Sequence, residues 1–526
     1  GTHASLAARF RDVADDLFEL SRHPDGLLGA RSREASSSLA ETLLAAVVDA
    51  ADPEQAARFL RLCFSRIRHS SVYARMLGDD PRALRRLVEA LGSSAFIGDA
   101  MVRYPELVDV VLFARGAPGP DVIRHTIEES LSEAAPDDDP EEALIAALRR
   151  AKARVTIEVG LADLSGEVGT REATLALSDL ADASLEAATR FALGTPAGEP
   201  VRGLAVIAMG KLGGREIGYG SDLDVFFLFD PARAPSGDRG PASDPVTYYA
   251  RRARQIIRLI SMSHAAGPGY ELDTRLRPSG SQGLLVTSLD SFARYHGIRR
   301  AGAALAEPDS SPGARHMGAA VWERLALIRA RAAAGDPELG AEAIAIAHEA
   351  AYLQADDFDR IADEIRRLRL RMERELSHER RGRRDFKLGR GGLVDIEFAV
   401  QLLQMRHGAD PRVRTTETLT AIEALESAGY LSPKHAEVFR DGHAFLRKLE
   451  QRIRIVHADA SQLLEENAPG VPLLARRTGI RGRTAAEAAT ELLARYGAIT
   501  GRVRAAYDAI VASGAAQEPG APGEAR

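Results

Sequence analysis

Two aspartates separated by one residue end a glycine-rich stretch in the middle of the chain. The stretch spans residues 209–224 and reads Met-Gly-Lys-Leu-Gly-Gly-Arg-Glu-Ile-Gly-Tyr-Gly-Ser-Asp-Leu-Asp. We expect Asp222 and Asp224 to open a strand, where residues i and i+2 face the same side, so that both carboxylates point into one space. Glycines let backbone N–H groups approach an anion closely. Two carboxylates beside such a turn suit a Mg²⁺ ion that is shared with a nucleotide triphosphate.

A third carboxylate lies on the next predicted strand, residues 270–276. The two-residue period of a strand places Asp273, Arg275 and Arg277 on one face, with the guanidinium groups suited to phosphate oxygens. A lone Asp-x-Asp is common and usually solvated. A glycine-rich turn, paired acids and a third acid at adjacent strand ends together favour a nucleotidyl-transfer site. Lys211 lies in the turn, but the residue order of a Walker A loop is absent.

Short apolar segments predict the small mixed sheet that must position these residues. The expected strands are 204–209, 225–229, 270–276 and 284–287. A loop is expected at 231–244 and helices at 246–265, at 170–192 and up to about Leu164. Helical pattern resumes near Val321 and continues to about Ser513, with breaks around Gly335, Gly389–Gly392 and Gly408. The predicted fold is therefore mainly α, with an embedded α/β nucleotidyltransferase domain of few strands and a C-terminal helical bundle.

Composition and charge limit the class of protein. The chain has 526 residues, of which 45% are apolar and 27% charged, and it is rich in helix-forming residues. The expected divisions are a helical region at 1–118, the catalytic domain at 119–340, the bundle at 341–513 and a disordered tail at 514–526. A formal net charge of -6 gives no bulk reason to expect a polyanionic partner. The single Cys63 excludes a disulfide framework.

The chain ends and the hydropathy point to a cytoplasmic protein. No apolar run approaches the roughly 20 residues that span a bilayer. The N-terminus, Gly1-Thr2-His3, has neither an initiator Met nor the apolar region of a signal peptide, so we expect an artificial chain boundary.

Other polar clusters have structural explanations. We expect residues 137–142 to form a solvated loop that leads into a helix N-terminus. The basic stretch at 366–384 is interleaved with glutamates and therefore predicts a salt-bridged helix face. The alternative is that it binds a nucleotide or an acidic partner. Asp395 and Glu397 could approach the site or could cap and pair within the helices. His407, His443 and His457 do not have the spacing of metal ligands, so we expect them to be structural.

Several motifs of the chain resemble the glutamine synthetase adenylyltransferase family. Besides the 209–224 stretch and Asp-Thr-Arg-Leu-Arg-Pro-Ser-Gly at 273–280, the similar runs are 178–181, 283–288, 322–324, 328–331 and 386–398. The resemblance covers most of residues 55–500. Members carry an N-terminal deadenylylating unit and a C-terminal adenylylating unit. The sequences of residues 218–224 and 277–280 resemble the C-terminal unit. We therefore expect the C-terminal half, and we assign no role to 299–317, where related sequences differ.

The resemblance implies a polymerase-β-like enzyme that moves AMP from ATP to a tyrosine hydroxyl of glutamine synthetase and releases pyrophosphate. It implies two Mg²⁺ ions on Asp222, Asp224 and Asp273, with Asp273 completing the site nearer the nucleophile. Around the triphosphate it implies Gly213, Gly214 and Ser221, with Lys211, Arg275 and Arg277 contacting phosphate or positioning the carboxylates. The implied regulators are a PII-type nitrogen signal protein and glutamine, with no nucleic acid and no membrane.

Three alternatives stay open on sequence grounds. The nearest is the reverse chemistry, phosphorolysis of adenylyl-tyrosine, because the reaction is microscopically reversible. A catalytically silent module that binds a nucleotide or a signal protein is another, although it has no chemical need for three converging carboxylates. Nucleic-acid polymerisation is disfavoured in a net-acidic chain without an aromatic and basic stripe.

Overall fold

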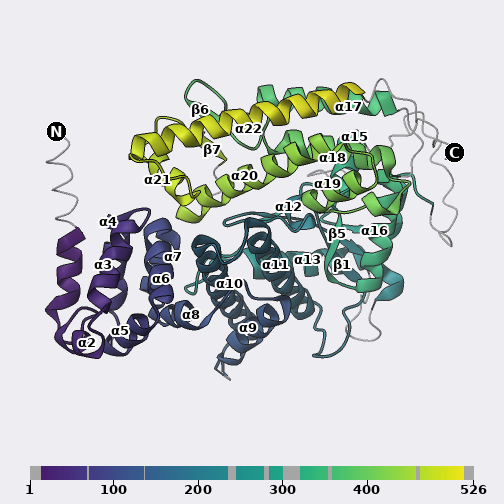
Figure 1. Ribbon diagram of the computed structural model, residues 1–526. Helices are drawn as coiled ribbons and strands as arrows, with labels where there is room; N and C mark the ends of the chain where they lie inside the picture. Colours follow the sequence, from purple (N-terminus) through teal and green to yellow (C-terminus); the bar gives the residue numbers. More distant parts are fainter. Residues whose placement is uncertain are drawn as a thin grey trace, which may run out of the picture.

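Long helices surround one small sheet in the computed structural model of the chain (Figure 1). The structure describes residues 13–67, 70–135, 137–234, 244–277, 283–299, 320–352, 358–457 and 462–513. The expected fold class, mainly α with an embedded α/β part of few strands and a helical C-terminal region, is confirmed. The stretch from residue 300 to 319, the Pro278–Gly280 motif and the expected tail at 514–526 lie outside the described residues.

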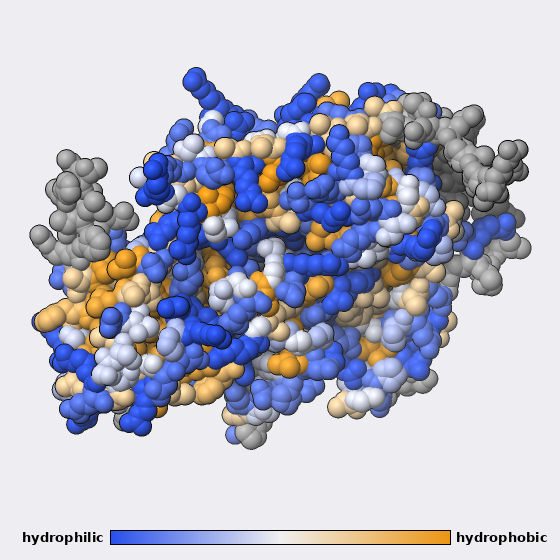
Figure 2. All heavy atoms as spheres, viewed as in Figure 1, coloured by the Kyte–Doolittle hydropathy of each residue, from blue (hydrophilic) through white to orange (hydrophobic). Residues whose placement is uncertain are grey.

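Short helices form the N-terminal part of the molecule. They are α2 (Ala30–Ala35), α3 (Leu39–Asp49), α4 (Pro53–Phe64), α5 (Ser70–Asp79), α6 (Pro81–Ser93), α7 (Ala95–Arg103), the 3₁₀ turn η1 (Pro105–Leu107) and α8 (Val108–Phe113). Asp52 and Asp80 begin α4 and α6 by accepting backbone N–H groups of the first turn, each before a proline at the first helical position. Figure 2 shows apolar side chains gathered on this part of the surface.

Three further helices connect this region to the sheet: α9 (Pro120–Ser132), α10 (Pro140–Ser165) and α11 (Thr170–Ala192). Asp139 accepts the N–H groups of Glu141 and Glu142 at the start of α10, which confirms the predicted loop leading into a helix N-terminus. Gly166 ends α10 at a φ of 77°, a left-handed conformation that glycine adopts without steric cost. The predicted helix at 170–192 coincides with α11.

The sheet contains β1 (Leu204–Ala208), β2 (Leu223–Phe229), β3 (Leu272–Asp273), β4 (Val286–Ser288) and β5 (Arg331–Gly335). β1 lies antiparallel to β2 and to β5, whereas β3 and β4 both lie parallel to β2. The elements that connect the strands are α12 (Gly210–Gly213), η2 (Pro231–Arg233), α13 (Pro245–Ser261), α14 (Leu289–Tyr295) and α15 (Val321–Leu327).

Several strands differ from the sequence prediction, β3 and β5 among those of this sheet. The strand expected at 270–276 ends at Asp273, because the Asp273 carboxylate accepts the N–H of Arg275 at 2.8 Å and turns the chain. β5, Arg-Ala-Ala-Ala-Gly, falls in a segment that was expected to be helical. Its residues have low intrinsic strand preference, so pairing with β1 determines its conformation.

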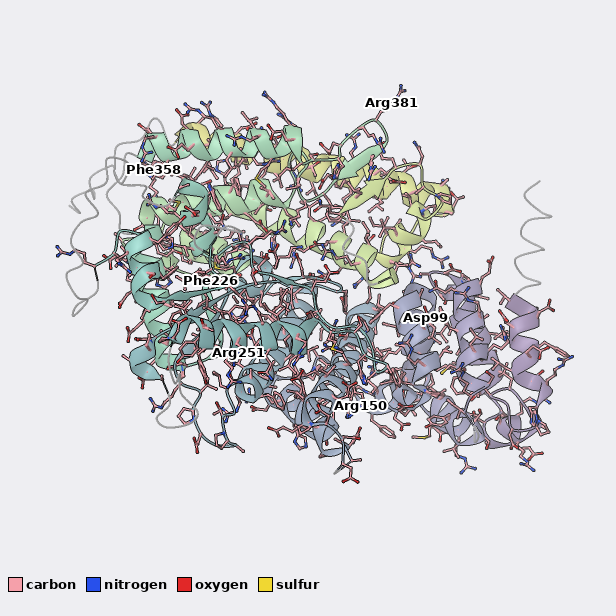
Figure 3. All side chains as sticks on the ribbon, turned by 180° about the vertical axis from the view of Figure 1, so that it is seen from behind. Asp99, Arg150, Phe226, Arg251, Phe358 and Arg381 are labelled. Atoms are coloured by element: carbon pink, nitrogen blue, oxygen red, sulfur yellow. The ribbon has the colours of Figure 1, made fainter. Side chains whose placement is uncertain are left out.

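Each face of the sheet is covered by a separate core. Val206 and Phe227 belong to the cluster formed with α10, α11 and α13. Ile207 and Phe226 belong to the other cluster, formed with α14, α15 and the C-terminal helices (Phe226 is labelled in Figure 3). β1 and β2 are therefore buried on both sides, which explains why their sequences are continuous apolar runs rather than alternating ones.

The C-terminal part consists of α16 (Pro337–Tyr352), α17 (Phe358–Glu375), α18 (Leu393–His407), η5 (Pro411–Val413), α19 (Thr418–Ser427), α20 (Pro433–His457), α21 (Val471–Arg477) and α22 (Ala485–Ser513), with a ribbon of β6 (Arg383–Asp385) and β7 (Leu463–Glu465). α20 reaches from this part to the N-terminal helices: Leu446 and Leu449 lie in the second core, whereas Ile455 lies in the first. Among the described residues, no helix is long and apolar enough to cross a bilayer.

A buried ion pair ties α20 to α10. Arg452 donates to Asp163 at 2.6 and 2.8 Å, and their side chains are 5% and 1% exposed. We expect Asp163→Ala to lower the free energy of unfolding by about 3–5 kcal/mol, because it leaves a guanidinium buried without its counter-ion. The matched control is Asp363→Ala, which breaks a solvent-exposed pair with Arg366 and should cost less than about 1 kcal/mol. Denaturant unfolding measures both, and equal losses would contradict the prediction.

Candidate active site

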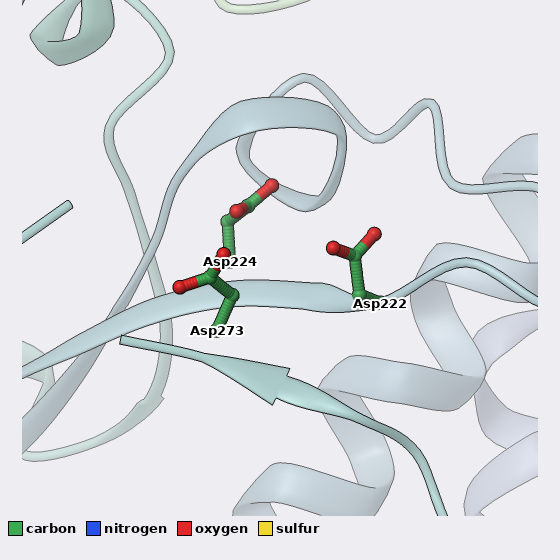
Figure 4. Close-up of side chains that lie close together, drawn as sticks. All are labelled: Asp222, Asp224 and Asp273. Atoms are coloured by element: carbon green, nitrogen blue, oxygen red, sulfur yellow. The ribbon is translucent and has the colours of Figure 1, made fainter. Parts of the chain in front are cut away.

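Three carboxylates meet at one edge of the sheet, where β1, β2 and β3 lie side by side (Figure 4). Asp222 directly precedes β2, Asp224 is its second residue, and Asp273 ends β3. Asp224 and Asp273 are register partners in the parallel pairing of these strands. One ligand atom from each of the three carboxylates lies within 4.8 Å of the others. The sequence prediction that these three acids converge is confirmed by this geometry.

Repulsion and burial shape the electrostatics of these acids. Partial burial of Asp224, together with the negative charges of Asp222 and Asp273, raises its pKa to about 6. Asp222 is exposed and Asp273 is half-buried. Carboxylate oxygens in this arrangement are the ligands that hard divalent cations prefer, and a bound cation would relieve the repulsion.

Arg275 forms hydrogen bonds with the Asp273 carboxylate and does not share a strand face with Asp273. Its guanidinium donates to the Asp273 carboxylate from Nε at 3.0 and 2.8 Å, and the hydrogen bonds lower the pKa of Asp273. The predicted common face of Asp273, Arg275 and Arg277 is wrong, because the strand ends before Arg275. Arg277 instead donates to the Thr274 carbonyl at 2.7 Å and to the Gly283 carbonyl at 3.3 Å, so it braces the turn.

Gly210 was not singled out from the sequence, yet it contacts an acid of the site. It has a φ of +52°, and a Cβ added to it would lie 2.3 Å from Oδ2 of Asp224. A side chain at this position would therefore displace the carboxylate. The N–H groups of Gly210, Lys211 and Leu212, at the start of α12, have no hydrogen-bond acceptor among the described residues.

Gly213 and Gly214 serve close backbone packing. A Cβ on Gly213 would lie 1.8 Å from the Arg329 carbonyl oxygen, and one on Gly214 would lie 3.1 Å from that of Thr416. Their N–H groups already donate to the carbonyls of Met209 and Gly210, at 2.7 and 3.1 Å. The nearest neighbours of these two glycines are thus Arg329 and Thr416 rather than the acids, and their donors are in use.

Ser221 and Lys211 both point toward α20. The Ser221 hydroxyl accepts the Gly218 N–H and Nη1 of Arg454, each at 3.0 Å. Nζ of Lys211 pairs with the Glu450 carboxylate. Burial lowers the pKa of Lys211 to about 7, an effect that the charge of Glu450 partly opposes.

Glu450 is fully buried and contacts three cations. Besides Lys211 it pairs with Arg447 and, at 3.1 Å, with Arg454. Burial alone would raise the pKa of Glu450, but the three cations hold it below its ordinary value. The next residue, Gln451, accepts the Tyr219 N–H at 3.2 Å. None of these α20 residues was singled out from the sequence, because their charges at helical spacing are also typical of a solvated face.

A second buried carboxylate fixes the other end of the glycine-rich loop. Glu216 accepts the Thr418 N–H at 2.7 Å and Nη1 of Arg329 at 3.2 Å, and Arg447 donates to its backbone carbonyl. Burial acts to raise its pKa, but Arg329, His443 and Arg447 lower the pKa of Glu216 to about 2. The loop from residue 216 to 221 is therefore held at both ends by residues of the C-terminal part.

The remaining candidates have structural partners. Asp395 pairs with buried Arg369 and accepts the Gly391 N–H at 2.7 Å, while Glu397 pairs with Arg329 at 3.4 Å. The basic stretch is partly a salt-bridged surface, as the Arg366–Asp363 pair shows, although Arg369 is buried. His407 stacks on Tyr430, with 3.9 Å between the ring centroids, and His443 is buried. The side chain of His457 lies outside the described residues.

Asp224→Asn should stabilise the protein at neutral pH. A raised carboxyl pKa means that the ionised form is disfavoured in the folded state, so the cost is present above about pH 6 and disappears as the pH falls below the ordinary value near 4. We expect the metal-free variant to gain up to about 3 kcal/mol above pH 6 and nothing near pH 4. Unfolding curves of both proteins across this range, in chelator, measure the difference. A variant that is less stable than the parent at pH 7 would contradict this view of the site.

Comparisons with known proteins identify relatives of the chain. Residues 84–301 match the family model of glutamate-ammonia ligase adenylyltransferase, and residues 346–511 match that of the GlnD PII-uridylyltransferase. A relative from Nitrosococcus oceani, named bifunctional glutamine synthetase adenylyltransferase/adenylyl-removing enzyme, is 33% identical over 447 residues, which are 81% of this chain and 44% of the relative. A Xanthomonas axonopodis pv. citri protein of the same name is 33% identical over 413 residues, 77% of this chain and 41% of its own.

The chain therefore spans less than half the length of these curated relatives. The two family-model matches include the acid triad, strands β1 to β4 and α20, and they confirm the family that the motifs indicated. On this geometry and these matches, the chain belongs to the glutamine synthetase adenylyltransferase family.

Proposed function

We propose that this chain transfers AMP from ATP to a tyrosine hydroxyl of glutamine synthetase, with release of pyrophosphate. The observation that carries the proposal is the convergence of three carboxylates within 4.8 Å beside a turn whose first N–H groups have no acceptor in the described part of the chain. In-line attack on the α-phosphorus needs charge neutralisation and positioning more than covalent chemistry by the protein. The family supports glutamine synthetase as the acceptor.

The donor set fits Mg²⁺, and two ions are proposed. Asp222 and Asp224 would hold both, and Asp273 would complete the site nearer the attacking hydroxyl. When bound, such ions acidify the attacking hydroxyl and neutralise charge at the phosphorus. The raised pKa of Asp224 fits this role, because the carboxylate repulsion in the metal-free site is what a divalent cation offsets.

The triphosphate is proposed to lie over the start of α12, where the N–H groups of Gly210, Lys211 and Leu212 lack acceptors among the described residues. Gly213, Gly214 and Ser221 would then shape this turn, rather than donate to phosphate from N–H groups or a hydroxyl that are already engaged. The Lys211 and Arg275 side chains would reach phosphate only by leaving Glu450 and Asp273, respectively.

The direction of the reaction is proposed from the motifs of the chain. The relatives carry both activities in their name, and the chain spans only 44% and 41% of them. The sequence Gly218–Ser221 resembles that of the adenylylating unit and therefore favours the forward reaction. The alternative is phosphorolysis of adenylyl-tyrosine on the same acids.

The proposed regulators are a PII-type nitrogen signal protein and glutamine. The similarity of residues 346–511 to the PII-uridylyltransferase family supports a PII-type partner for the C-terminal helices. A cytoplasmic location is part of the same proposal, in keeping with a single, buried and unpaired Cys63. A catalytically silent module is disfavoured, because it would have no use for a carboxylate as unfavourably placed as Asp224.

The direct test incubates the chain with glutamine synthetase, labelled ATP and Mg²⁺ and measures protein-bound AMP. We expect incorporation by the parent chain and a loss of several orders of magnitude in Asp224→Asn, because the variant loses a metal-ligand charge but keeps its fold. A parallel reaction with phosphate and pre-adenylylated glutamine synthetase should release little ADP. Efficient phosphorolysis without forward transfer would show that the direction is wrong, and near-normal transfer by the variant would remove the metal-site assignment.

Variants of Asp273 and Arg275 test whether Asp273 serves the attacking hydroxyl or the nucleotide. Asp273→Asn should keep Mg·ATP affinity within about tenfold yet nearly abolish transfer, because the hydroxyl loses the group that activates it. Arg275→Ala removes an exposed partner of Asp273 and should change transfer by less than about tenfold. Calorimetric titration of Mg·ATP and single-turnover transfer measure both. An Asp273→Asn variant that fails to bind ATP but transfers normally at saturating ATP would reverse the assignment.

A further inference from the structure

A groove opens beside Asp222 and leads away from the acid triad toward the N-terminal helices. Its cavity volume is about 570 Å³, and its walls are α7, α10, the loop at residues 266–271 and residues 217–222 of the glycine-rich loop. Of the three acids, Asp222 lines it and is the exposed one. The nucleotide side of the triad, where Gly210 contacts Asp224, is not part of its lining. A molecule that fills the groove therefore reaches the acids from a side other than the start of α12.

The walls of this groove are held in place before any ligand binds. The Tyr104 hydroxyl donates to the Ala266 carbonyl at 3.0 Å, and Lys152 donates to the Gly269 carbonyl at 2.6 Å. The Lys152 ammonium also lies 4.2 Å from the centre of the Tyr270 ring. These contacts tie the loop to α7 and α10, so binding would not have to order it.

The charge of the groove does not suit a triphosphate. Asp99, Asp222 and Glu271 line it, and Lys152 already donates to backbone carbonyls. Arg103, exposed at the end of α7, has no ion pair or hydrogen bond with the described residues. Figure 3 labels Asp99, on the N-terminal helices beside the sheet-bearing part. Three acids face three cations, Arg103, Lys152 and the buried Arg149, so the lining offers no net positive charge to attract a polyanion.

The apolar part of the lining suits a polypeptide. Phe96, Tyr104, Tyr270 and Pro268 provide aromatic and apolar surface between the charged side chains. Aromatic rings, one free guanidinium and separated carboxylates are the mixed surface that protein interfaces use. An extended segment carrying a tyrosine can place that ring against the aromatics and pass its hydroxyl by Asp222 into the acid triad, where Asp273 lies.

We propose that this groove binds the tyrosine-bearing segment of the acceptor protein, with Arg103 and Phe96 as its main contacts. The inference rests on the proposed function and adds the place where the acceptor docks. Nucleotide and acceptor then approach the triad from two sides, as in-line transfer requires.

The test is direct binding, so it does not depend on turnover. Immobilised parent chain and variants are titrated with glutamine synthetase by interferometry and with Mg·ATP by calorimetry. Arg103→Glu should weaken acceptor binding about tenfold and leave Mg·ATP affinity within about twofold. The matched control is Arg85→Glu, at an exposed arginine of α6 outside the groove, and it should change neither. Phe96→Ala, compared with Phe113→Ala on exposed Phe113 of α8, tests the apolar contact.

Each outcome decides the proposal. Weaker acceptor binding in the two groove variants, with thermal melting unchanged in Arg103→Glu, supports it. Weaker Mg·ATP binding with normal acceptor binding would assign the groove to the nucleotide and overturn it. Equal effects of groove and control variants, or no binding of glutamine synthetase by the parent chain, would also overturn it. A parent chain that binds glutamine synthetase through the groove but transfers no AMP would instead refute the proposed function alone.

Discussion

The carboxylate of Glu450 lies fully buried on α20 and contacts cations from two distant parts of the chain. Lys211 comes from the turn after β1, whereas Arg447 and Arg454 come from α20 itself. Removing one partner of such a cluster leaves uncompensated charge in the interior, which costs several kcal/mol. The turn and the helix are therefore constrained to stay together, although more than two hundred residues separate them in sequence.

This cluster and its neighbours determine the shape of the glycine-rich loop. Arg454 also holds Ser221, one residue before the first acid, and Gln451 holds the backbone of Tyr219. At the other end of the loop, Glu216 is fixed by Arg329. With both ends held, the loop can bring Asp222 beside Asp224 despite their mutual repulsion. The C-terminal helices thus act on the site as its scaffold, in addition to any part that they play in regulation.

Sequence reasoning located the acids but not the groups that hold them. Asp222, Asp224 and Asp273 could be predicted because strand period and apolar runs are local signals. The end of β3 at Asp273 could not, because an Asp side chain that accepts an N–H two residues later competes with the strand. β5 became a strand through pairing with β1, and Glu450 is buried by tertiary packing. Neither fact has a signature in the local sequence. Gly210 did have a local signature, because it is a glycine directly after a buried strand. Its role depends on its contact with Asp224.

Anomalous diffraction from a crystal soaked with Mn²⁺ and a non-hydrolysable ATP analogue tests the central claim, that the three carboxylates form one metal site for a nucleotide. The account predicts Mn²⁺ peaks within coordination distance of Asp222, Asp224 and Asp273, with the phosphates of the analogue over the start of α12. The peaks should be absent from crystals of Asp224→Asn. Mn²⁺ and nucleotide bound elsewhere, with the acid triad empty, would contradict it.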